Sequence, residues 1–259
     1  MPLAEQHVDL SARTTADLEY KIAATREERA SAFRLVYTSY LEAGLGEPNS
    51  RQMRVTPYHL LPTTEVFIAT LDGEPLFTVS LVVDGELGLP MESVYAREVA
   101  QRRAQGIVLG EVCCLADRRS QFREFFPVFL RLCRLMVQYA LKRGVAELLV
   151  AVHPRHVRFY RRFMSFEAIS QQVAYPTVRN HPAVALSLNF KRVDEERPWN
   201  YETFFGQALP PELLEPQPIT WSQCEYFRLA IDPSFAPVPL GSTDEFSGGR
   251  TAEPALSFA

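Results

Sequence analysis

A single acidic residue, Glu111, interrupts the otherwise apolar stretch GEVCCLA at residues 110–116. A carboxylate inside a strand is costly unless it is paired or takes part in chemistry. Burial raises the pKa of such a group toward that of a working general base. Two interpretations therefore remain open. Glu111 is either a base that takes a proton from a substrate or half of a structural ion pair, with Arg34 as its candidate partner.

Histidines and cysteines near this stretch can also move protons or act as nucleophiles. His153 and His156 flank the end of the next apolar run, where they suit proton transfer but also capping or surface roles. Cys113 and Cys114 are adjacent in a strand, so we expect them on opposite faces. No His/Asp pattern that would activate a thiolate accompanies them, and we interpret them as strand packing. No metal-ligand spacing is present, and no metal is expected.

The elements around these residues predict an α/β fold. The chain reads as a strand (107–116), a long helix (125–144), a buried strand (147–154) and a short helix (155–163). This alternation indicates parallel strands joined by a helical crossover. Ligands bind beyond the carboxyl ends of such strands, which here carry Ala116–Arg119 and His153–Arg158.

The flanking segments complete a mixed sheet. Thr25 and Glu28 have the spacing of a capping box that starts a helix. Asp72–Gly73 is a turn signal between two apolar runs. We predict a first strand (20–24), a helix (26–44), a hairpin (65–85), a helical excursion (87–106) and two further strands within 167–190.

The chain divides by composition into four parts. Residues 1–18 form a polar leader, and residues 19–192 form one α/β domain. Residues 193–232 are rich in proline and aromatic residues, and we expect short helices that pack back on the domain. The composition of residues 233–259 indicates a disordered tail.

Charge is unevenly distributed along the chain. The total is −4, but residues 118–162 hold eleven Lys and Arg against two acidic residues, so this segment is +9 and the remainder −13. The basic segment is either a solvated helix face or a docking face for a phosphorylated or acidic partner. Nucleic-acid binding is not favoured. With no signal peptide, no bilayer-length apolar run and no disulfide pattern, we expect a cytoplasmic protein with reduced thiols.

Four stretches resemble one protein family. They are AFRLVYTSYLEAGL (32–45), MRVTPYHLLPTTEVFIA (53–69), LGLPMESVY with GEVCCLA (87–116) and HPRHVRFYRRFMSFE (153–167). Together they resemble the FeeM-type N-acyl amino acid synthases, which have a GNAT-like acyltransferase fold and are related to the acyl-homoserine-lactone synthases. The resemblance covers about residues 20–190 and implies a mixed central sheet flanked by helices, followed here by a C-terminal extension.

The resemblance implies transfer of a long-chain acyl group from acyl carrier protein to the α-amine of an amino acid. The donor would be the acyl-phosphopantetheine of the carrier, with acyl-CoA as an alternative, and no permanently bound cofactor is expected. Three other interpretations remain open. They are an acetyl-CoA-dependent small-molecule N-acetyltransferase, an autoinducer-type synthase and a non-catalytic binding module of the same fold.

Two departures from ordinary acetyl-CoA enzymes are visible. Those enzymes cradle a pyrophosphate in a glycine-rich loop before the central helix. The corresponding loop here, DRRSQFREFFP, has no glycine and three arginines. Arginine side chains suit the single phosphate of a carrier protein better than a tight amide nest. The second departure is Ser165, which stands where a glycine usually ends the short helix.

The resemblance also implies roles for individual residues. Glu111 would be the base and Tyr160 the acid that protonates the departing thiolate. Arg34 would bind the substrate carboxylate, and Thr63, Thr64 and His59 would line the amine site. The remaining expected residues concern the acyl donor: backbone N–H groups near Leu115 and Ala116, the arginines Arg118, Arg119, Arg123, Arg155 and Arg158, and Phe122, Phe125, Phe126 and Phe129, which suit either an acyl tunnel or plain core.

Overall fold

The computed structural model describes residues 18–118 and 122–235, of which 122–125 are described in their backbone only. Its centre is an eight-stranded sheet in the order β1-β2-β3-β4-β5-β8-β6, with β7 paired to β8. Only β4 and β5 run parallel in this sheet, and the other pairs are antiparallel. The strands are β1 (Glu19–Ile22), β2 (Thr64–Leu71), β3 (Glu74–Val83), β4 (Leu109–Asp117), β5 (Glu147–Val152), β6 (Glu167–Ala168), β7 (Val173–Tyr175) and β8 (His181–Asn189).

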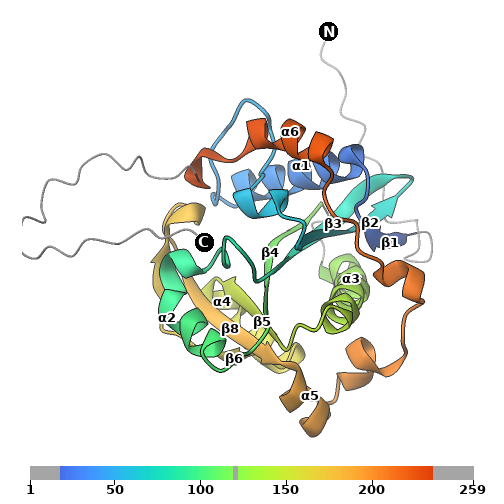
Figure 1. Cartoon of the computed structure of the whole chain (residues 1–259), viewed down its shortest axis with the longest axis vertical. Coiled ribbons are helices and arrows are strands. Elements are labelled where there is room, and N and C mark those ends of the chain that lie inside the picture. Colours follow the sequence, from blue (N-terminus) through green and yellow to red (C-terminus); the bar gives the residue numbers. More distant parts are fainter. Residues whose placement is uncertain (1–17, 119–121, 236–259) are drawn as a thin grey trace, which may run out of the picture.

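Helices cover both faces of the sheet (Figure 1). On one face lie α1 (Arg26–Glu42) and α2 (Glu92–Arg103); on the other lie α3 (Phe122–Lys142) and α4 (Pro154–Phe163). Two short helices follow the sheet, α5 (Phe190–Glu196) and α6 (Trp221–Phe227). In the two described ranges, no helix has the length and apolarity needed to cross a membrane.

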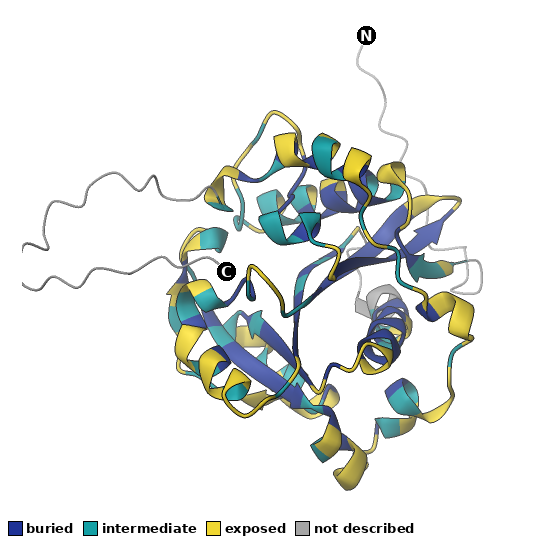
Figure 2. Ribbon diagram, in the orientation of Figure 1, coloured by how far each residue is buried: buried dark blue, intermediate teal, exposed yellow. Residues whose placement is uncertain are grey.

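The alternation of side chains in β2 shows why both faces must be covered. Phe67 and Ala69 belong to the cluster under α3, whereas Val66 and Ile68 belong to the cluster under α1. Successive strand residues point to opposite faces, so a strand covered on both sides is apolar over most of its length, as residues 66–69 of β2 are. All eight residues of β2 are buried, as the dark central strands of Figure 2 illustrate.

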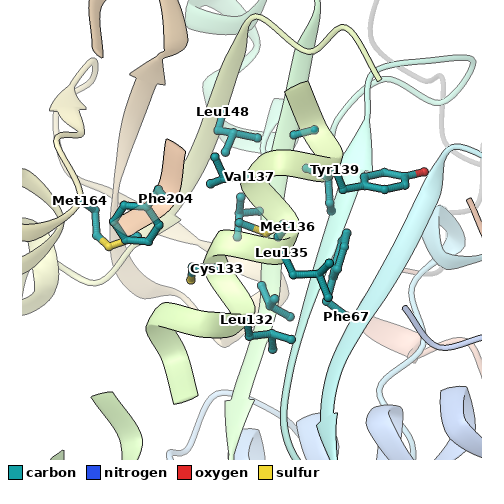
Figure 3. Close-up of a cluster of buried hydrophobic side chains, with 14 of the residues drawn as sticks. Phe67, Leu132, Cys133, Leu135, Met136, Val137, Tyr139, Leu148, Met164 and Phe204 are labelled. Atoms are coloured by element: carbon teal, nitrogen blue, oxygen red, sulfur yellow. The ribbon is translucent and has the colours of Figure 1, made fainter. Parts of the chain in front are cut away.

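The largest core cluster lies between α3 and the sheet (Figure 3). Leu132 and Leu135 of α3 belong to this cluster together with Phe67 of β2 and Leu148 of β5, and all four are buried; in Figure 3, Leu135 lies beside Phe67. Phe204, from the segment after α5, joins the same cluster. Each fully buried side chain of this size stabilises the fold by about 1.5–3 kcal/mol.

Two local sequence signals have the predicted outcome. Thr25 accepts from the Glu28 N–H at 3.1 Å, and the Glu28 carboxylate accepts from the Thr25 N–H at 2.9 Å, so the capping box starts α1. Asp72 and Gly73 both have positive φ, 53° and 82°, which is the conformation of a type I′ turn between β2 and β3.

The sequence prediction of two strands after α4 is wrong, because the first is broken into β6 and β7. At the break, the Ser170 hydroxyl accepts from the Ala185 N–H at 2.8 Å and replaces a backbone partner. A side chain that takes over a ladder hydrogen bond interrupts the pairing of the backbone. Beyond Gln172 the chain pairs with β8 again as β7.

The segment after β8 packs against the domain. In α3, the Gln138 amide donates to the carbonyls of Phe204 and Gln207 at 3.2 and 2.9 Å and accepts from the Leu209 N–H at 2.8 Å. Further along, the Gln217 N–H donates to the buried carboxylate of Glu65 at 3.0 Å. Backbone groups of the extension therefore find partners on α3 and β2.

The predicted tail starts too early in the chain. Pro233–Phe235 form a helical turn, in which the Phe235 N–H donates to the Asp232 carbonyl at 2.9 Å. The remainder of the predicted tail, from residue 236, and most of the predicted leader, residues 1–17, lie outside the described residues.

Candidate active site

The parallel strands β4 and β5 separate in the middle of the sheet. Their pairing covers Leu109–Glu111 opposite Glu147–Leu149 and goes no further. On its other side, β4 pairs Cys113 with Ser80 and Ala116 with Thr78, which leaves one extra residue in β4. This is a β-bulge, and Cys114 within it has a φ of 51°. The bulge and the end of pairing together open the sheet beyond Glu111.

A cavity of about 150 Å³ lies at this opening. Its walls come from α1, β4, the end of β5, the segment before β8 and the C-terminal extension. The residues with polar or aromatic side chains that line it are Tyr40, Arg54, Thr56, Glu111, Cys113, Cys114, His153, Tyr175, Thr177, His181 and Phe235.

Glu111 is 2% exposed and lies beside the start of α2. Its Oε2 accepts from the Met91 N–H at 2.8 Å. Burial raises the pKa of Glu111 to about 8, with smaller increases from Cys114 and Glu92 and a lowering by the Met91 N–H. Among the described residues it forms no salt bridge, so the predicted pair with Arg34 is absent. A carboxyl group of this kind exchanges its proton near neutral pH.

Arg54 is the second charged group of the cavity, and sequence reasoning missed it. Its guanidinium is buried and forms a salt bridge with Asp232, with 2.8 Å between Nη1 and Oδ2. Nη2 donates to the Thr177 carbonyl at 2.7 Å. Its Cζ lies over the rings of Tyr40 and Phe235, 4.7 and 5.3 Å from their centroids. Nε is buried and has no hydrogen-bond partner in the part of the chain that the structure describes.

A weak signal for Arg54 exists in the sequence. The residue lies between Met53 and Val55, both of which are apolar and buried. A charged residue in such a setting indicates a paired or functional group, as it did for Glu111. The partner could not be found in the same way, because Asp232 is 178 positions away.

The two adjacent cysteines do not point to opposite faces, contrary to the prediction. Both line the cavity, because the left-handed conformation of Cys114 breaks the alternation of the strand. A hydrogen bond to Cys114 and burial raise the pKa of Cys113, which keeps it a neutral thiol. All four cysteines of the chain are free. Cys113 and Cys114 therefore line the cavity in addition to packing within the strand.

Of the other predicted residues, His153 reaches the cavity and the backbone near Leu115 and Ala116 reaches the bulge. His153 also caps α4 by accepting from the Arg155 N–H at 3.2 Å. Tyr160 does not line this cavity. Its ring packs edge-on against Phe166 with centroids 5.5 Å apart, and burial raises its pKa, so the phenol stays protonated.

Four predicted substrate-binding residues lie elsewhere. Arg34 is exposed on α1 beside a different surface pocket. His59 is 1% exposed, and both ring nitrogens are engaged: Nδ1 accepts from the Thr56 N–H at 2.9 Å, and Nε2 lies 3.1 Å from the Ser80 hydroxyl. Thr63 is exposed and Thr64 buried at the start of β2. None of these four residues lines the cavity that holds Glu111.

The predicted donor arginines lie on the surface. Arg118 shares the exposed pocket of Arg34, and Arg155 is exposed with its Nε 2.9 Å from Nε2 of His156. Arg158 lines a surface pocket of about 660 Å³ together with Arg161, Arg162 and Arg192. Arg119 and the side chain of Arg123 lie outside the described part of the chain.

The phenylalanines proposed for an acyl tunnel form a packed aromatic cluster where they are described. Phe126 and Phe129 stack with centroids 6.5 Å apart, and Phe159 contacts both at 6.2 and 5.8 Å. The side chains of Phe122 and Phe125 are outside the described set. Within that set there is also no group of three or more His, Cys, Asp or Glu side chains able to hold a metal ion.

Comparison with known proteins yields one family. The family model described as "N-acyl amino acid synthase FeeM" matches residues 31–189, which is more than half of the chain. No curated protein matches the sequence.

Solved structures agree with this result. FeeM, an N-acyl amino acid synthase from uncultured soil microbes, is 29% identical with a TM-score of 0.60; 67% of this chain and 90% of FeeM are covered. The CoA-dependent acyl-homoserine lactone synthase BjaI is 13% identical with a TM-score of 0.54, covering 82% and 100% of the two chains. The AHL synthase LasI is 12% identical with a TM-score of 0.51, covering 74% and 96%. The expected mixed sheet flanked by helices, with the fold of these acyltransferases, is confirmed.

Proposed function

Because this chain belongs to the FeeM family of N-acyl amino acid synthases and is an N-acyltransferase, we propose that it transfers a long-chain fatty acyl group from acyl carrier protein to the α-amine of an amino acid. One observation carries this proposal. Glu111, a buried carboxyl group with a pKa raised to about 8, lies in the cavity where β4 and β5 separate. Amide formation from an ammonium needs a base with this property.

In the proposed reaction, Glu111 takes one proton from the substrate ammonium, directly or through water. The neutral nitrogen attacks the thioester carbonyl and forms the C–N bond. Backbone N–H groups near Leu115 and Ala116 donate to the oxyanion of the tetrahedral intermediate. The C–S bond then breaks, and the leaving thiolate takes the proton of Tyr160, the candidate acid, whose phenol is protonated and lies outside the cavity lining. The nitrogen's second proton replaces the one that Tyr160 gives up, and Glu111 releases its own proton to solvent.

The carrier protein as donor is supported by charge and by the loop before α3. That loop has arginines and no glycine, unlike the phosphate-binding loops of CoA enzymes. Arg155 and Arg158 are exposed, and the pocket beside Arg158 adds Arg161, Arg162 and Arg192. An acidic carrier with one phosphate complements such a surface. Acyl-CoA is the alternative donor, since BjaI is described as CoA-dependent.

We place the reaction in the cytoplasm. Four free cysteines, two of them in the wall of the cavity, suit a reducing compartment.

Mass spectrometry of lipid extracts tests the proposal. Cells that express the chain are compared with cells that express Glu111→Gln. A fatty-acyl amino acid that appears with the first and disappears with the second supports the proposal and identifies both substrates. The matched control is Glu65→Gln, which removes another buried carboxylate that does not line the cavity. We expect cells that express this control to make the same amount of fatty-acyl amino acid as wild type, when the product is normalised to the amount of folded protein.

Purified protein then separates the donors. The amino acid identified in cells is supplied with either acyl carrier protein or CoA carrying the same acyl chain. A preference for the carrier supports the proposed donor. Equal or better rates with acyl-CoA would contradict it, and no amide from either donor would reject the proposed reaction.

A further inference from the structure

A buried arginine has an unused hydrogen-bond donor in the cavity that holds Glu111. Arg54 lines this cavity, its side chain is 4% exposed, and its buried Nε–H has no partner within residues 18–118 and 122–235. Nearly all buried polar groups in proteins are hydrogen-bonded, so each exception requires a reason. An arginine that lines a cavity with part of its donor capacity unused is a candidate site for an anionic group.

The guanidinium is held in one orientation from several sides. Asp232 binds Nη1, the Thr177 carbonyl binds Nη2, and the rings of Tyr40 and Phe235 flank Cζ. Each terminal nitrogen carries a second N–H beyond these contacts, so the guanidinium keeps donors for a ligand. A group that is fixed before the ligand arrives loses little conformational entropy on binding.

The C-terminal extension supplies the residue that holds Arg54 in place, Asp232. Asp232 Oδ1 accepts from the N–H and the hydroxyl of Ser234 at 2.9 and 2.7 Å, which fixes the carboxylate. The Asp232 N–H donates to the Val55 carbonyl at 2.8 Å, and Val55 bridges Ile231 in parallel. Residues 231–235 therefore run beside the segment that carries Arg54 and are hydrogen-bonded to it.

The two ionisable side chains Arg54 and Glu111 match the two ionisable groups of an amino acid, its carboxylate and its ammonium. Among the described residues that line it, Arg54 is the only permanently cationic side chain and Glu111 the only carboxyl group. The cavity's volume of about 150 Å³ equals that of about five waters, which suits the α-carbon with its two charged groups. An acceptor whose ammonium faces Glu111 would direct its carboxylate toward Arg54.

We propose that Arg54 binds the carboxylate of the acceptor amino acid, and that residues 231–235 complete this acceptor site, with Asp232 as the positioning residue. The proposal rests on the N-acylation proposed above. It assigns part of the site to a segment beyond residues 31–189, the part matched by the family model.

The test compares each of the twenty common amino acids with its carboxamide, which keeps the amine and lacks the anionic carboxylate. For the accepted amino acid, we expect kcat/KM with the wild-type chain to be roughly 10- to 100-fold higher than for its amide, as for a hydrogen bond to a charged group. The double variant Arg54→Gln with Asp232→Asn removes both buried charges, so that neither is left unpaired. In this double variant, we expect the ratio of kcat/KM for the acid to kcat/KM for the amide to fall to within about threefold of unity, because the charged contact is gone.

Two single variants sharpen the test. Asp232→Asn leaves Arg54 charged but less fixed, and should raise KM for the acid with little change in kcat or in KM for the acyl donor. Arg97→Gln removes an exposed arginine of α2 outside the cavity and should leave the ratio unchanged. If the ratio of kcat/KM for acid and amide fell toward unity in Arg34→Gln and not in the Arg54 double variant, the proposal would be overturned. Arg34 is the other arginine suggested for this role.

Calorimetry separates this proposal from the proposed reaction. The same acids and amides are titrated into the wild-type chain and the double variant without an acyl donor. Carboxylate-dependent binding that the double variant loses supports the role of Arg54 even if no amide product is found in cells. If the wild-type chain prefers no acid over its amide in either rate or binding, Arg54 is not the carboxylate site.

Discussion

At the scale of single residues, Glu111 and Arg54 share one physical property. Each is a charged residue type buried at a place where the protein leaves it incompletely paired. Such groups destabilise a fold, and proteins retain them where they serve a function. The behaviour of Glu111 with pH gives two direct tests of this view for that residue.

The first prediction concerns rate against pH. With a pKa of about 8, Glu111 is mostly protonated at pH 6, so kcat/KM for the amine should rise about tenfold per pH unit and level off above about pH 8. The substrate ammonium titrates as well. Glu111→Gln therefore serves as the reference, because it retains only the substrate's contribution. Identical profiles for the two enzymes would exclude Glu111 as the base.

The second prediction concerns stability. Glu111 has a pKa of about 8 in the folded state and 4.5 as the ordinary value, so the folded state holds one more proton between these pH values. Wild-type stability should therefore fall from about pH 5 to pH 8, by at most about 5 kcal/mol. Glu111→Gln should lack this loss and have the higher Tm at pH 8. Parallel Tm curves against pH would contradict the burial of the charge.

The sequence allowed one of these residues to be predicted. Glu111 stands out because its immediate neighbours are apolar strand residues, so local pattern alone indicates it. Arg54 also lies between apolar residues, but its partners Asp232, Thr177 and Phe235 come from remote segments. Arg34, which the resemblance suggests for the carboxylate, follows the buried Phe33, and one residue further along the helix its side chain faces solvent.

At the scale of elements, the turn after α4 contains a strained position. Ser165 has a φ of 57°, in the left-handed region where a side chain with Cβ costs about 1–2 kcal/mol. The sequence indicated this site, since glycine is usual there. Its carbonyl accepts from Arg192 at 2.6 Å, a backbone contact that a glycine would keep.

The third prediction follows from this strain. Ser165→Gly should stabilise the protein by about 0.5–1 kcal/mol, because relief of strain exceeds the added freedom of the unfolded chain. Chemical denaturation measures the change. Ser39→Gly, in the interior of α1, is the matched control and should destabilise by a similar amount. A loss of stability in both variants would refute the strain at Ser165.

Elements with local signals were predictable, and those set by remote pairing were not. Thr25 with Glu28 and Asp72 with Gly73 each fix a boundary through neighbours a few residues apart. The separation of β4 from β5 has no such signal, because the residues beyond the paired ones, 112–116 in β4 and 150–152 in β5, are apolar in both strands. The opening that forms the cavity depends on a bulge at Cys114, and a cysteine in the left-handed region is not expected from its type.

At the scale of the whole molecule, the C-terminal extension is part of the fold. Phe204 is 4% exposed within the main core cluster, whereas Trp221 of the same extension is 79% exposed. Buried Glu65 adds a polar link, since it accepts from both Tyr139 of α3 and Gln217 of the extension at 3.0 Å. The composition of this segment indicated that it packs on the domain. It did not indicate which of its aromatic residues are buried.

The fourth prediction compares these two aromatic residues. Phe204→Ala should lower the free energy of unfolding by about 3–5 kcal/mol, since it leaves a cavity in the core. Trp221→Ala should change it by less than about 0.5 kcal/mol. Urea titrations with a common m-value measure both. Equal effects would mean that the extension is not anchored through Phe204.

The bond between Arg54 and Asp232 also has a consequence in time. The two residues are 178 positions apart, so at ribosomal rates of about 5–20 residues per second the acid is made roughly 10 to 35 seconds after the arginine. During that interval the domain's strands and main helices can assemble, but the cavity lacks Asp232, which orients Arg54. On the proposed role of this pair, the acceptor site is completed late in biosynthesis, and an incomplete chain that already has its sheet would bind the acceptor's carboxylate weakly.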